Sequence, residues 1–323
     1  MELDVLQTQK YIKKIKDFFQ LTLASTLDLE RVSAPLFVLR ETGLNDQLNG
    51  YEKAIDFKLF DNKTAEIVHS LAKWKRYALS KYNFPVHTGL YTDMNAIRKD
   101  ETVDNIHSYY VDQWDWEYVI NKDERNEETL KQIVNKIYGV LLKTEAFIHS
   151  EIPQIEMCLP EKIHFVTSQE LEDLYPNLSA KEREQEITKQ YGAVFLMKVG
   201  GALKSGKPHD GRSPDYDDWE LNGDILVWFD TINMALELSS MGIRVDKDSL
   251  MKQLELSGTL DRLECDYHKM VINNELPLTI GGGIGQSRLC MFFLRKKHIG
   301  EVQVSVWPDE VLKECQEKGI HLL

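Results

Sequence analysis

The chain has 323 residues, of which 42% are hydrophobic and 28% charged, a balance typical of a globular protein with a sizeable core. The formal net charge of −13 argues against a nucleic-acid-binding protein with a basic face, and no apolar run approaches the roughly 20 residues needed to cross a bilayer. The N-terminal segment is unlike a signal peptide, and the four widely spaced cysteines indicate reduced thiols. We therefore expect a cytoplasmic protein that binds neither membranes nor nucleic acid.

The first half of the chain predicts helices interspersed with strands. Apolar residues at helical spacing predict a helix over Gln9–Leu27. "RVSAPLFVL" follows as an extended segment, which Pro35 restricts to a sheet edge or a strand end. The further elements are a strand over Ala54–Phe60 paired with "AEIVHS", a helix over "LAKWKRYALSKY", a strand over Ser108–Val119 and a helix over Glu124–Ser150.

The strand "SYYVDQWDWEYV" has the clearest pattern in the sequence. Its period of two separates an aromatic face from a face that carries polar groups. The aromatic face holds Tyr110, Trp114, Trp116 and Tyr118, and the other holds Val111, Gln113, Asp115 and Glu117. We expect the aromatic face to pack under helices, while the opposite face directs several polar groups the same way.

The second half predicts more strands in succession. The expected strands are "KIHFV", "AVFLMKVGG", "DILVWF" and "ALELSSMGIRV", the last broken near Gly242; the expected helices are "AKEREQEITKQY", Lys247–Leu256, Asp261–Asn273 and one opened by "GQSRLCMFFLRKK". Because the strands do not alternate regularly with helices, we expect an α+β fold: a mostly antiparallel central sheet flanked by helices, in a single domain over residues 1–323.

Two glycine-containing segments resemble nucleotide-binding motifs only partly. "TIGGGIGQSRLCM" lacks the third glycine and the later acid of a dinucleotide fingerprint, and too little chain follows it. "GALKSGK" fits a P-loop until Pro208, where a hydroxyl is required. We interpret the latter as part of a surface loop, Gly201–Asp218, able to close over a ligand. Glycines beside Arg288 indicate close approach of the backbone to a ligand.

Several charged residues have an ordinary interpretation when each is taken alone. Asp224 and Glu237, on adjacent predicted strands, suit either solvent or a Mg²⁺ ion that bridges phosphates. Arg98 is typical of a surface arginine, Lys73 and Lys75 of a solvated helix face, and "PDYDDW" of a solvated turn. The histidines show no metal-ligand spacing, so we expect no zinc site.

Taken together, these segments resemble a known family. In order, they resemble motifs two and three of the class II aminoacyl-tRNA synthetase catalytic domain, with "VSAPLF" resembling motif one. The strings "VHSLAKWKR", "YVDQWDWE", "PDYDDW", "LNGDILVW", "ELSSMGIRV" and "TIGGGIGQSRL" resemble aspartate–ammonia ligase over almost the whole chain. The sequence departs from the family pattern at one place. Only Glu220–Leu221 joins "PDYDDW" to "NGDILVW", which is shorter than the family pattern suggests, so the presence of a surface loop there is in doubt.

The resemblance implies a reaction, a fold and a set of site residues. L-aspartate, ATP and ammonia would give asparagine, AMP and pyrophosphate through a β-aspartyl-adenylate, with Mg²⁺ on the phosphates, in a homodimer that meets near Pro35. The implied catalytic residues are Arg98, Asp46 and Gln113; the implied substrate-binding residues are Lys73, Lys75, Asp115, Ser240 and Arg244; the implied ATP-binding residues are Arg98, Gly281, Gly282, Gly283, Gly285 and Arg288; and the implied metal ligands are Asp224 and Glu237.

Other residues bear on the nitrogen source and on the rival functions. A glutamine-using synthetase with an N-terminal nucleophile needs a cysteine after Met1, but the first cysteine here is Cys158. A tRNA synthetase of the aspartyl or asparaginyl type would carry an anticodon-binding domain, for which this sequence leaves no room. A non-enzymatic relative would be expected to have lost residues needed for the reaction, but Arg98, Glu237 and Arg288 are present.

Overall fold

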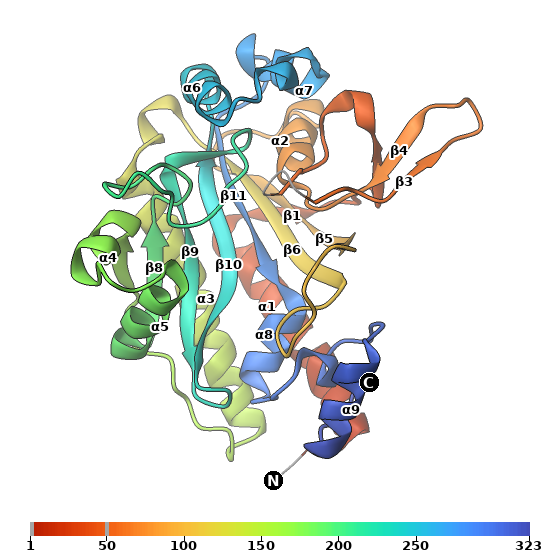
Figure 1. The fold of residues 1–323 in the computed structure, drawn as a ribbon, viewed down its shortest axis with the longest axis vertical. Helices are drawn as coiled ribbons and strands as arrows, with labels where there is room; N and C mark the ends of the chain where they lie inside the picture. The colour runs from red at the N-terminus through yellow and green to blue at the C-terminus, as the bar shows by residue number, and fades with distance from the viewer. Residues whose placement is uncertain (1–2, 49–51) are drawn as a thin grey trace.

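The computed structural model describes residues 3–48 and 52–323. Its centre is an eight-stranded sheet with the strand order β1-β5-β6-β11-β10-β9-β8-β7 (Figure 1). These strands are β1 (Leu29–Arg31), β5 (Gly89–Ile97), β6 (Tyr110–Val119), β7 (His164–Thr167), β8 (Ala193–Met197), β9 (Asp217–Phe229), β10 (Met234–Arg244) and β11 (Thr279–Gly285). A three-stranded sheet, β2-β4-β3, projects to one side and consists of β2 (Phe37–Leu39), β3 (Asp56–Lys58) and β4 (Thr64–Ile67).

Helices surround the central sheet in the described part of the chain. The α-helices are α1 (Val5–Leu27), α2 (Ala72–Lys81), α3 (Glu127–Glu151), α4 (Ser168–Leu174), α5 (Ala180–Tyr191), α6 (Lys247–Ser257), α7 (Asp266–Ile272), α8 (Gln286–Phe293) and α9 (Asp309–Glu317). Short 3₁₀ turns are η1 (Arg40–Thr42), η2 (Lys122–Glu124), η3 (Leu260–Glu264) and η4 (Ile299–Glu301).

The central sheet is mixed, although the sequence predicts a mostly antiparallel one. The inner pairs are antiparallel, as predicted. The edge pairs β1/β5 and β7/β8 are parallel, because the chain crosses back through other elements before it forms each second strand. The expected α+β class therefore holds, with a correction at both edges of the sheet.

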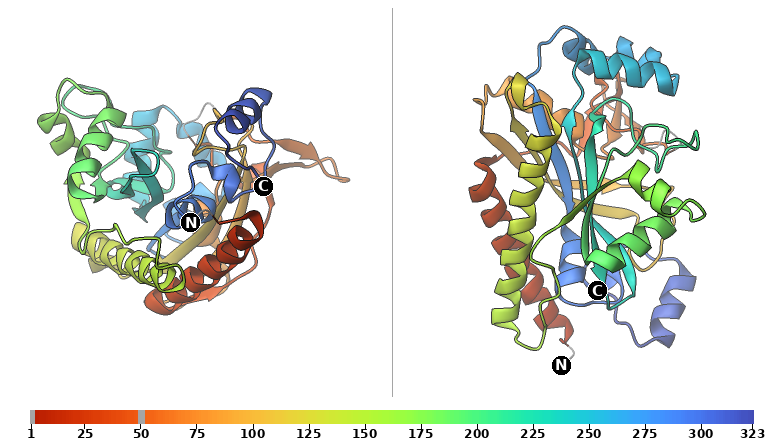
Figure 2. Two further views of the ribbon diagram at one scale, coloured as in Figure 1. Left: turned by 90° about the horizontal axis from the view of Figure 1, so that it is seen from below. Right: turned by 90° about the vertical axis from the view of Figure 1, so that its left-hand side faces the viewer.

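Helices α1 and α3 lie side by side along one face of the sheet (Figure 2). Phe18 and Phe147 stack between the two helices, with ring centroids 4.3 Å apart. Phe19 of α1 stacks on Trp114 of β6 at 4.8 Å, and Trp114 and Trp116 are fully buried in the main hydrophobic cluster. The predicted packing of these two tryptophans under helices is confirmed, and the polar face of β6 consequently points to the opposite side of the sheet.

Several predicted boundaries move because of local capping. Helix α1 begins at Val5, ahead of the apolar pattern, because Asp4 and Gln7 form a capping box. Helix α8 ends at Phe293, short of the lysines that follow, and Arg295 adopts a left-handed conformation with φ of 53°. The sequence analysis did not anticipate α4 or α9, whose short sequences carry little periodicity.

Strands β9 and β10 differ from expectation in length and continuity. The short join Glu220–Leu221 lies inside β9, which runs without a loop from Asp217 to Phe229. The predicted break near Gly242 is a register shift between Gly242 and Arg244 within a continuous β10. A second shift, between Glu237 and Ser239, is a β-bulge.

The glycine run forms strand β11 in the middle of the sheet, between β6 and β10. A Cβ atom on Gly281 would lie 2.0 Å from Glu117 Oε2 and 2.6 Å from Arg244 Nη2, and one on Gly283 would lie 2.6 Å from Gln113 Oε1. The missing side chains of β11 therefore make room for polar side chains of the two neighbouring strands.

No helix in residues 3–48 and 52–323 is long and apolar enough to span a bilayer. The single domain over residues 1–323 stays a prediction, since residues 1–2 and 49–51 lie outside the described ranges.

We expect Gly281→Ala to lower the free energy of unfolding by about 2–4 kcal/mol, because the added methyl group would separate the buried Glu117 from Arg244. Urea unfolding followed by circular dichroism measures this change. Gly139→Ala is the matched control: its Cβ meets nothing within 4 Å, and helix propensity predicts a slight gain in stability. Equal urea midpoints for Gly281→Ala and the wild type would contradict the role given to this glycine.

Candidate active site

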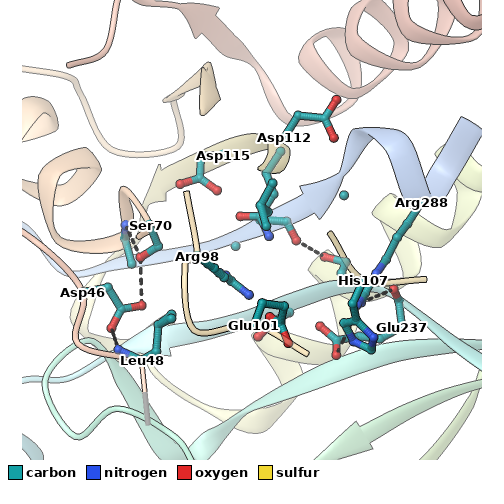
Figure 3. Close-up of a pocket in the computed structure, with 18 of the residues that line it drawn as sticks. Asp46, Leu48, Ser70, Arg98, Glu101, His107, Asp112, Asp115, Glu237 and Arg288 are labelled. Carbon is teal, nitrogen blue, oxygen red and sulfur yellow. Dashed lines mark hydrogen bonds and ion pairs between the residues drawn. The ribbon is translucent and has the colours of Figure 1, made fainter. Parts of the chain in front are cut away.

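A cavity of about 430 Å³ opens on the sheet face opposite α1 and α3 (Figure 3). Its floor is formed by β6, β11 and β10, and its walls include the segment after β5 and the loop between β8 and β9. Many of its lining side chains are charged, and the low dielectric of such a site makes each charge depend on its partners.

One wall of the cavity is built around Lys75 of α2, which is buried. The Lys75 Nζ donates a 2.9 Å hydrogen bond to the Gly282 carbonyl and lies 3.6 Å from an Asp115 carboxylate oxygen. Burial lowers the pKa of Lys75, and the charge of Arg244 adds to this, against the attraction of Asp115. Asp115 also accepts a hydrogen bond from the Leu71 amide at 3.1 Å, so α2 and β6 are tied together at this point.

Beneath Lys75 lies a buried ion cluster of Arg244 with Glu117 and Asp217. The Arg244 Nε and Nη2 donate to Glu117 at 2.9 and 2.7 Å, and its Nη1 donates to Asp217. Burial would raise the pKa of Glu117, but the charge and hydrogen bonds of Arg244 outweigh burial and lower it. Burial and the Glu117 charge raise the pKa of Asp217, against the attraction of Arg244 and Arg212.

Asp46 and Ser70 meet at one end of the cavity. The Ser70 hydroxyl donates to Asp46 Oδ2 at 3.0 Å, and the Leu48 amide donates to Asp46 Oδ1 at 2.9 Å. Asp46 is buried, with 2% of its surface exposed, so its carboxylate is fixed in position and borders the cavity.

Arg98 lies between this end and the opposite one (Figure 3). It directly follows β5, and its amide donates to the Tyr109 carbonyl at 2.8 Å, which closes the loop between β5 and β6. Its side-chain Nε is buried and, within the described residues, has no hydrogen-bond partner. A buried guanidinium nitrogen without a partner indicates a place for an anionic ligand.

Arg288 and Glu237 mark the other end. The Arg288 Nη1 donates to the Glu237 carbonyl at 3.1 Å and lies 4.0 Å from its carboxylate. The β10 bulge at residues 237–239 puts Glu237 on the same face as Ser240, although an odd number of positions, three, separates them in sequence. Burial would raise the pKa of Glu237, but the charges of Arg288 and Arg212 outweigh burial and lower it.

Asp224 of β9 lies opposite Ser240 in the sheet register. Both of its carboxylate oxygens accept hydrogen bonds from Arg212 Nη2 at 2.6 Å, and Arg212 Nη1 donates to the Ser240 hydroxyl at 2.8 Å. Burial raises the pKa of Asp224 to about 6. The charge of Arg212 opposes this rise, and the negative charge of Glu237 adds to it.

The structure brings most of the predicted site residues into one cavity. Those that line it are Asp46, Lys75, Arg98, Gln113, Asp115, Glu237, Ser240, Arg244, Gly282, Gly283, Gly285 and Arg288. Those outside the lining are Lys73, Asp224 and Gly281. Lys73 points instead to the buried Asp215 at 2.9 Å, and Gly281 adjoins the Glu117–Arg244 pair.

The sequence pattern did not point to several other residues that line the cavity, among them Ser70, Arg212, Tyr216 and Asp217. Three of them belong to the Gly201–Asp218 loop and its "PDYDDW" run, which alone is typical of a solvated turn. Here Asp215 and Asp217 are almost completely buried, because cations from distant segments surround them. The density of charged residues in "PHDGRSPDYDDW" was the available signal.

Asp215 holds this loop in place. Lys73, His268 and Arg262 approach one of its carboxylate oxygens at 2.9, 2.9 and 3.0 Å, and the Ser213 hydroxyl donates to the other at 2.8 Å. Burial would raise the pKa of Asp215, but the charge of Lys73 and the hydrogen bond from His268 lead the contacts that lower it well below its usual range. Lys73 thereby fastens the loop to α2.

A family model described as aspartate-ammonia ligase matches residues 6–319. Over 325 residues the chain is 59% identical to an aspartate–ammonia ligase of Ligilactobacillus salivarius, covering 100% of this chain and 97% of that one. Over 321 residues it is 59% identical to an aspartate–ammonia ligase of Fusobacterium nucleatum subsp. nucleatum, covering 99% and 98%.

Solved structures with a similar fold include two asparaginyl-tRNA synthetases, both in complex with asparaginyl-adenylate. The Pyrococcus horikoshii enzyme has a TM-score of 0.68 at 16% identity, over 93% of this chain and 70% of that one. The Entamoeba histolytica enzyme has a TM-score of 0.67 at 14% identity, over 93% and 66%. At these identities the likeness shows a common fold, which is the class II synthetase fold expected from the sequence.

We expect Asp215→Asn to lower the free energy of unfolding by about 3–5 kcal/mol at neutral pH, because Lys73 and Arg262 would remain buried without their anion. Since the folded pKa of Asp215 lies below its unfolded value, this contribution is present above about pH 4 and is lost as the pH falls further. The difference between variant and wild type should therefore shrink in acid.

Urea unfolding at several pH values measures this difference. Asp61→Asn is the control, because the Asp61–Lys63 pair is more than half exposed on both sides and such pairs contribute at most about 1 kcal/mol. An Asp215→Asn effect as small as that of the control would refute the anchoring role.

Proposed function

The chain belongs to the aspartate–ammonia ligase family and is a ligase that uses L-aspartate, ammonia and ATP; we propose that it joins them through a β-aspartyl-adenylate. The β-carboxylate of aspartate attacks the α-phosphorus of ATP, and pyrophosphate leaves. Neutral ammonia then attacks the activated carbonyl carbon, AMP leaves with the electron pair of the broken carbon–oxygen bond, and the nitrogen loses a proton. The products are asparagine, AMP and pyrophosphate, so the reaction serves asparagine biosynthesis.

The observation that carries this proposal is the position of Arg98. Arg98 lines the cavity between the Asp46–Ser70 contact and the Glu237–Arg288 pair (Figure 3), and its buried Nε has no hydrogen-bond partner among the described residues. A guanidinium there would contact both the attacking carboxylate and the α-phosphate, and neutralise the charge that gathers between them in the transition state. Among residues 3–48 and 52–323 no anion forms a hydrogen bond with the Arg98 Nε, so this nitrogen need not leave a protein partner before it contacts a ligand.

Aspartate would lie at the end of the cavity that contains Asp46, Gln113 and Asp115. Asp115, held by the Leu71 amide, offers an anion for the α-ammonium group. Lys75 and Arg244 offer cations for the α-carboxylate, and the Glu117 and Asp217 carboxylates fix the direction of Arg244. Buried groups held in this way reject analogues that leave them unpaired. Lys73 stays a less direct candidate, since Asp215 occupies its ammonium group.

The nucleotide would lie toward β10 and β11. Gly282, Gly283 and Gly285 border the cavity there. A Cβ on Gly285 would meet nothing closer than the Arg288 side chain, at 3.4 Å, so this glycine best permits a flat ring to approach the backbone. Arg288 is placed to contact the ring or the terminal phosphates. Gly281 lies outside the lining and is assigned to the support of the sheet, because its empty side faces Glu117.

Asp224 and Glu237 suit a magnesium ion that arrives with the nucleotide. In the described residues no group of three or more His, Cys, Asp or Glu side chains is arranged to hold a metal. Two carboxylates on adjacent strands, close enough for the charge of Glu237 to raise the pKa of Asp224, fit an ion whose remaining ligands are phosphate oxygens and water. Bound Mg²⁺ would stabilise the charge on the leaving pyrophosphate.

The ammonia end is assigned to Asp46, with Gln113 and Ser240 as further candidates on the cavity wall. The Asp46 carboxylate is fixed by Ser70 and by the Leu48 amide, so it offers a fixed anion to an incoming ammonium ion and an acceptor for its proton. We keep the homodimer and the cytoplasmic location as part of the proposal, on the family resemblance.

Purified protein incubated with ATP, Mg²⁺, L-aspartate and an ammonium salt should form AMP and asparagine in equal amounts, as resolved by chromatography. Both should require aspartate, and asparagine should require ammonium, which glutamine should not replace. AMP without asparagine would point to another acceptor, with transfer RNA tested next, and no nucleotide turnover would refute the proposal.

We expect Arg98→Ala to lower kcat/KM for aspartate-dependent pyrophosphate release by about 10²–10³-fold, because the transition state would lose its positioned cation. Arg98→Lys should recover part of the rate, since it restores charge without the planar fork. Lys318→Ala, which removes an exposed cation paired with Glu314, should stay within about twofold of the wild type. Normal turnover by Arg98→Ala would exclude the role assigned to this residue.

A further inference from the structure

Arg212 occupies the carboxylate that the proposed function assigns to magnesium. Its Nη2 lies 2.6 Å from each oxygen of Asp224, and its Nη1 lies 2.8 Å from the Ser240 hydroxyl. Only 14% of the Arg212 side chain and 15% of the Asp224 side chain are exposed, so this pair is largely shielded from water and from salt.

A divalent ion on Asp224 would compete directly with this contact. The Arg212 Nη2 contacts both carboxylate oxygens of Asp224 at once, which is where a metal ion would bind. The positive charge of Arg212 also helps to lower the pKa of Glu237. A magnesium ion shared by Asp224 and Glu237 would therefore meet an occupied carboxylate and a like charge within a poorly screened cavity.

The backbone on both sides of Arg212 is held in place. His209 pairs with Glu184 at 3.0 Å on one side. On the other, the Ser213 carbonyl accepts from Trp219 Nε1 at 3.3 Å, and its hydroxyl donates to the anchored Asp215. A guanidinium displaced from Asp224 therefore moves by rotation of its own side chain and stays at the cavity wall, which Arg212 already lines.

We propose that Arg212 is a placeholder cation: without nucleotide it neutralises Asp224 and keeps it directed at Ser240, and when magnesium arrives with ATP it yields Asp224 and turns to the phosphates. This inference rests on the proposed function, because it assumes that a metal–nucleotide complex binds here. Arg212 would then be a positioning residue before the reaction and a phosphate contact during it. As a result, a metal ion alone would bind weakly, and a metal ion together with nucleotide would bind strongly.

The placeholder role predicts opposite changes in two affinities. In Arg212→Met the side chain keeps its approximate length but loses its charge, so Mn²⁺ alone should bind about tenfold more tightly than to the wild type. ATP with Mg²⁺ should bind about tenfold more weakly, because the phosphates lose a cation. Electron paramagnetic resonance of free Mn²⁺, without nucleotide or aspartate, measures the first affinity, and equilibrium dialysis of labelled ATP measures the second.

Two further variants make the measurement specific. Asp224→Asn, added to Arg212→Met, should abolish the gain in Mn²⁺ binding if the ion sits on Asp224. Arg125→Met is the matched control, since Arg125 also pairs with an aspartate, Asp218, at 16% exposure, and does not line the cavity; it should leave both affinities within about twofold of the wild type.

A purely structural role for Arg212 would weaken both affinities together, and that result would overturn the inference. Unchanged Mn²⁺ binding in Arg212→Met would overturn it as well, as would a gain that survives Asp224→Asn. The Mn²⁺ titration contains no ATP, aspartate or ammonium, so a wild-type protein that formed no asparagine would refute the proposed function without altering this readout.

Discussion

The buried ion pair between Arg244 and Glu117 is the interaction on which the surrounding structure depends. Both side chains are almost completely excluded from water, and such a pair is tolerated only when nearly every lone pair and proton has a partner. Asp217 takes one arm of the guanidinium, and Thr279 donates to Glu117 at 2.7 Å. The pair crosses β11 on its way from β10 to β6, so the strand between them needs a glycine at position 281.

This constraint orders the end of the cavity that contains Asp115, to which the proposed function assigns aspartate. Because Glu117 is committed to Arg244, Lys75 stays near Asp115 and the Gly282 carbonyl, and α2 is held against the sheet. The cavity thus combines cations and anions whose directions are set before any ligand arrives, which is the condition for electrostatic stabilisation of a transition state. Although the chain has a net charge of −13, the cavity gathers several cations, among them Lys75, Arg98 and Arg244. Arg98 contrasts with Arg244, because its Nε has no hydrogen-bond partner in the part of the chain that the structure describes.

The sequence predicted those parts of the fold and site that depend on local pattern. The period-two face of β6 placed Gln113, Asp115 and Glu117 together, and the helical spacing of α1 placed Phe19 toward the sheet. The resemblance to aspartate–ammonia ligase was confirmed, and most of the site residues that it implied line the cavity. The parallel edge pairs were missed, since strand direction depends on how the chain returns to the sheet and leaves no period in the sequence. The capping boxes and the end of α8 moved boundaries by a few residues.

The sequence by itself determined which residue types are present and the family to which the chain belongs. In the long helices and strands it also determined which face each side chain occupies. Only the tertiary structure decided which charges neutralise one another. Lys73 and Lys75 are two positions apart on one helix, yet one pairs with Asp215 in a loop and the other lies beside Asp115 in the sheet. Arg212 reaches Asp224 through a loop that alone looks solvated. Such pairs join segments distant in sequence, and their strength depends on burial, which arises only when the sheet, α2 and the loop pack together.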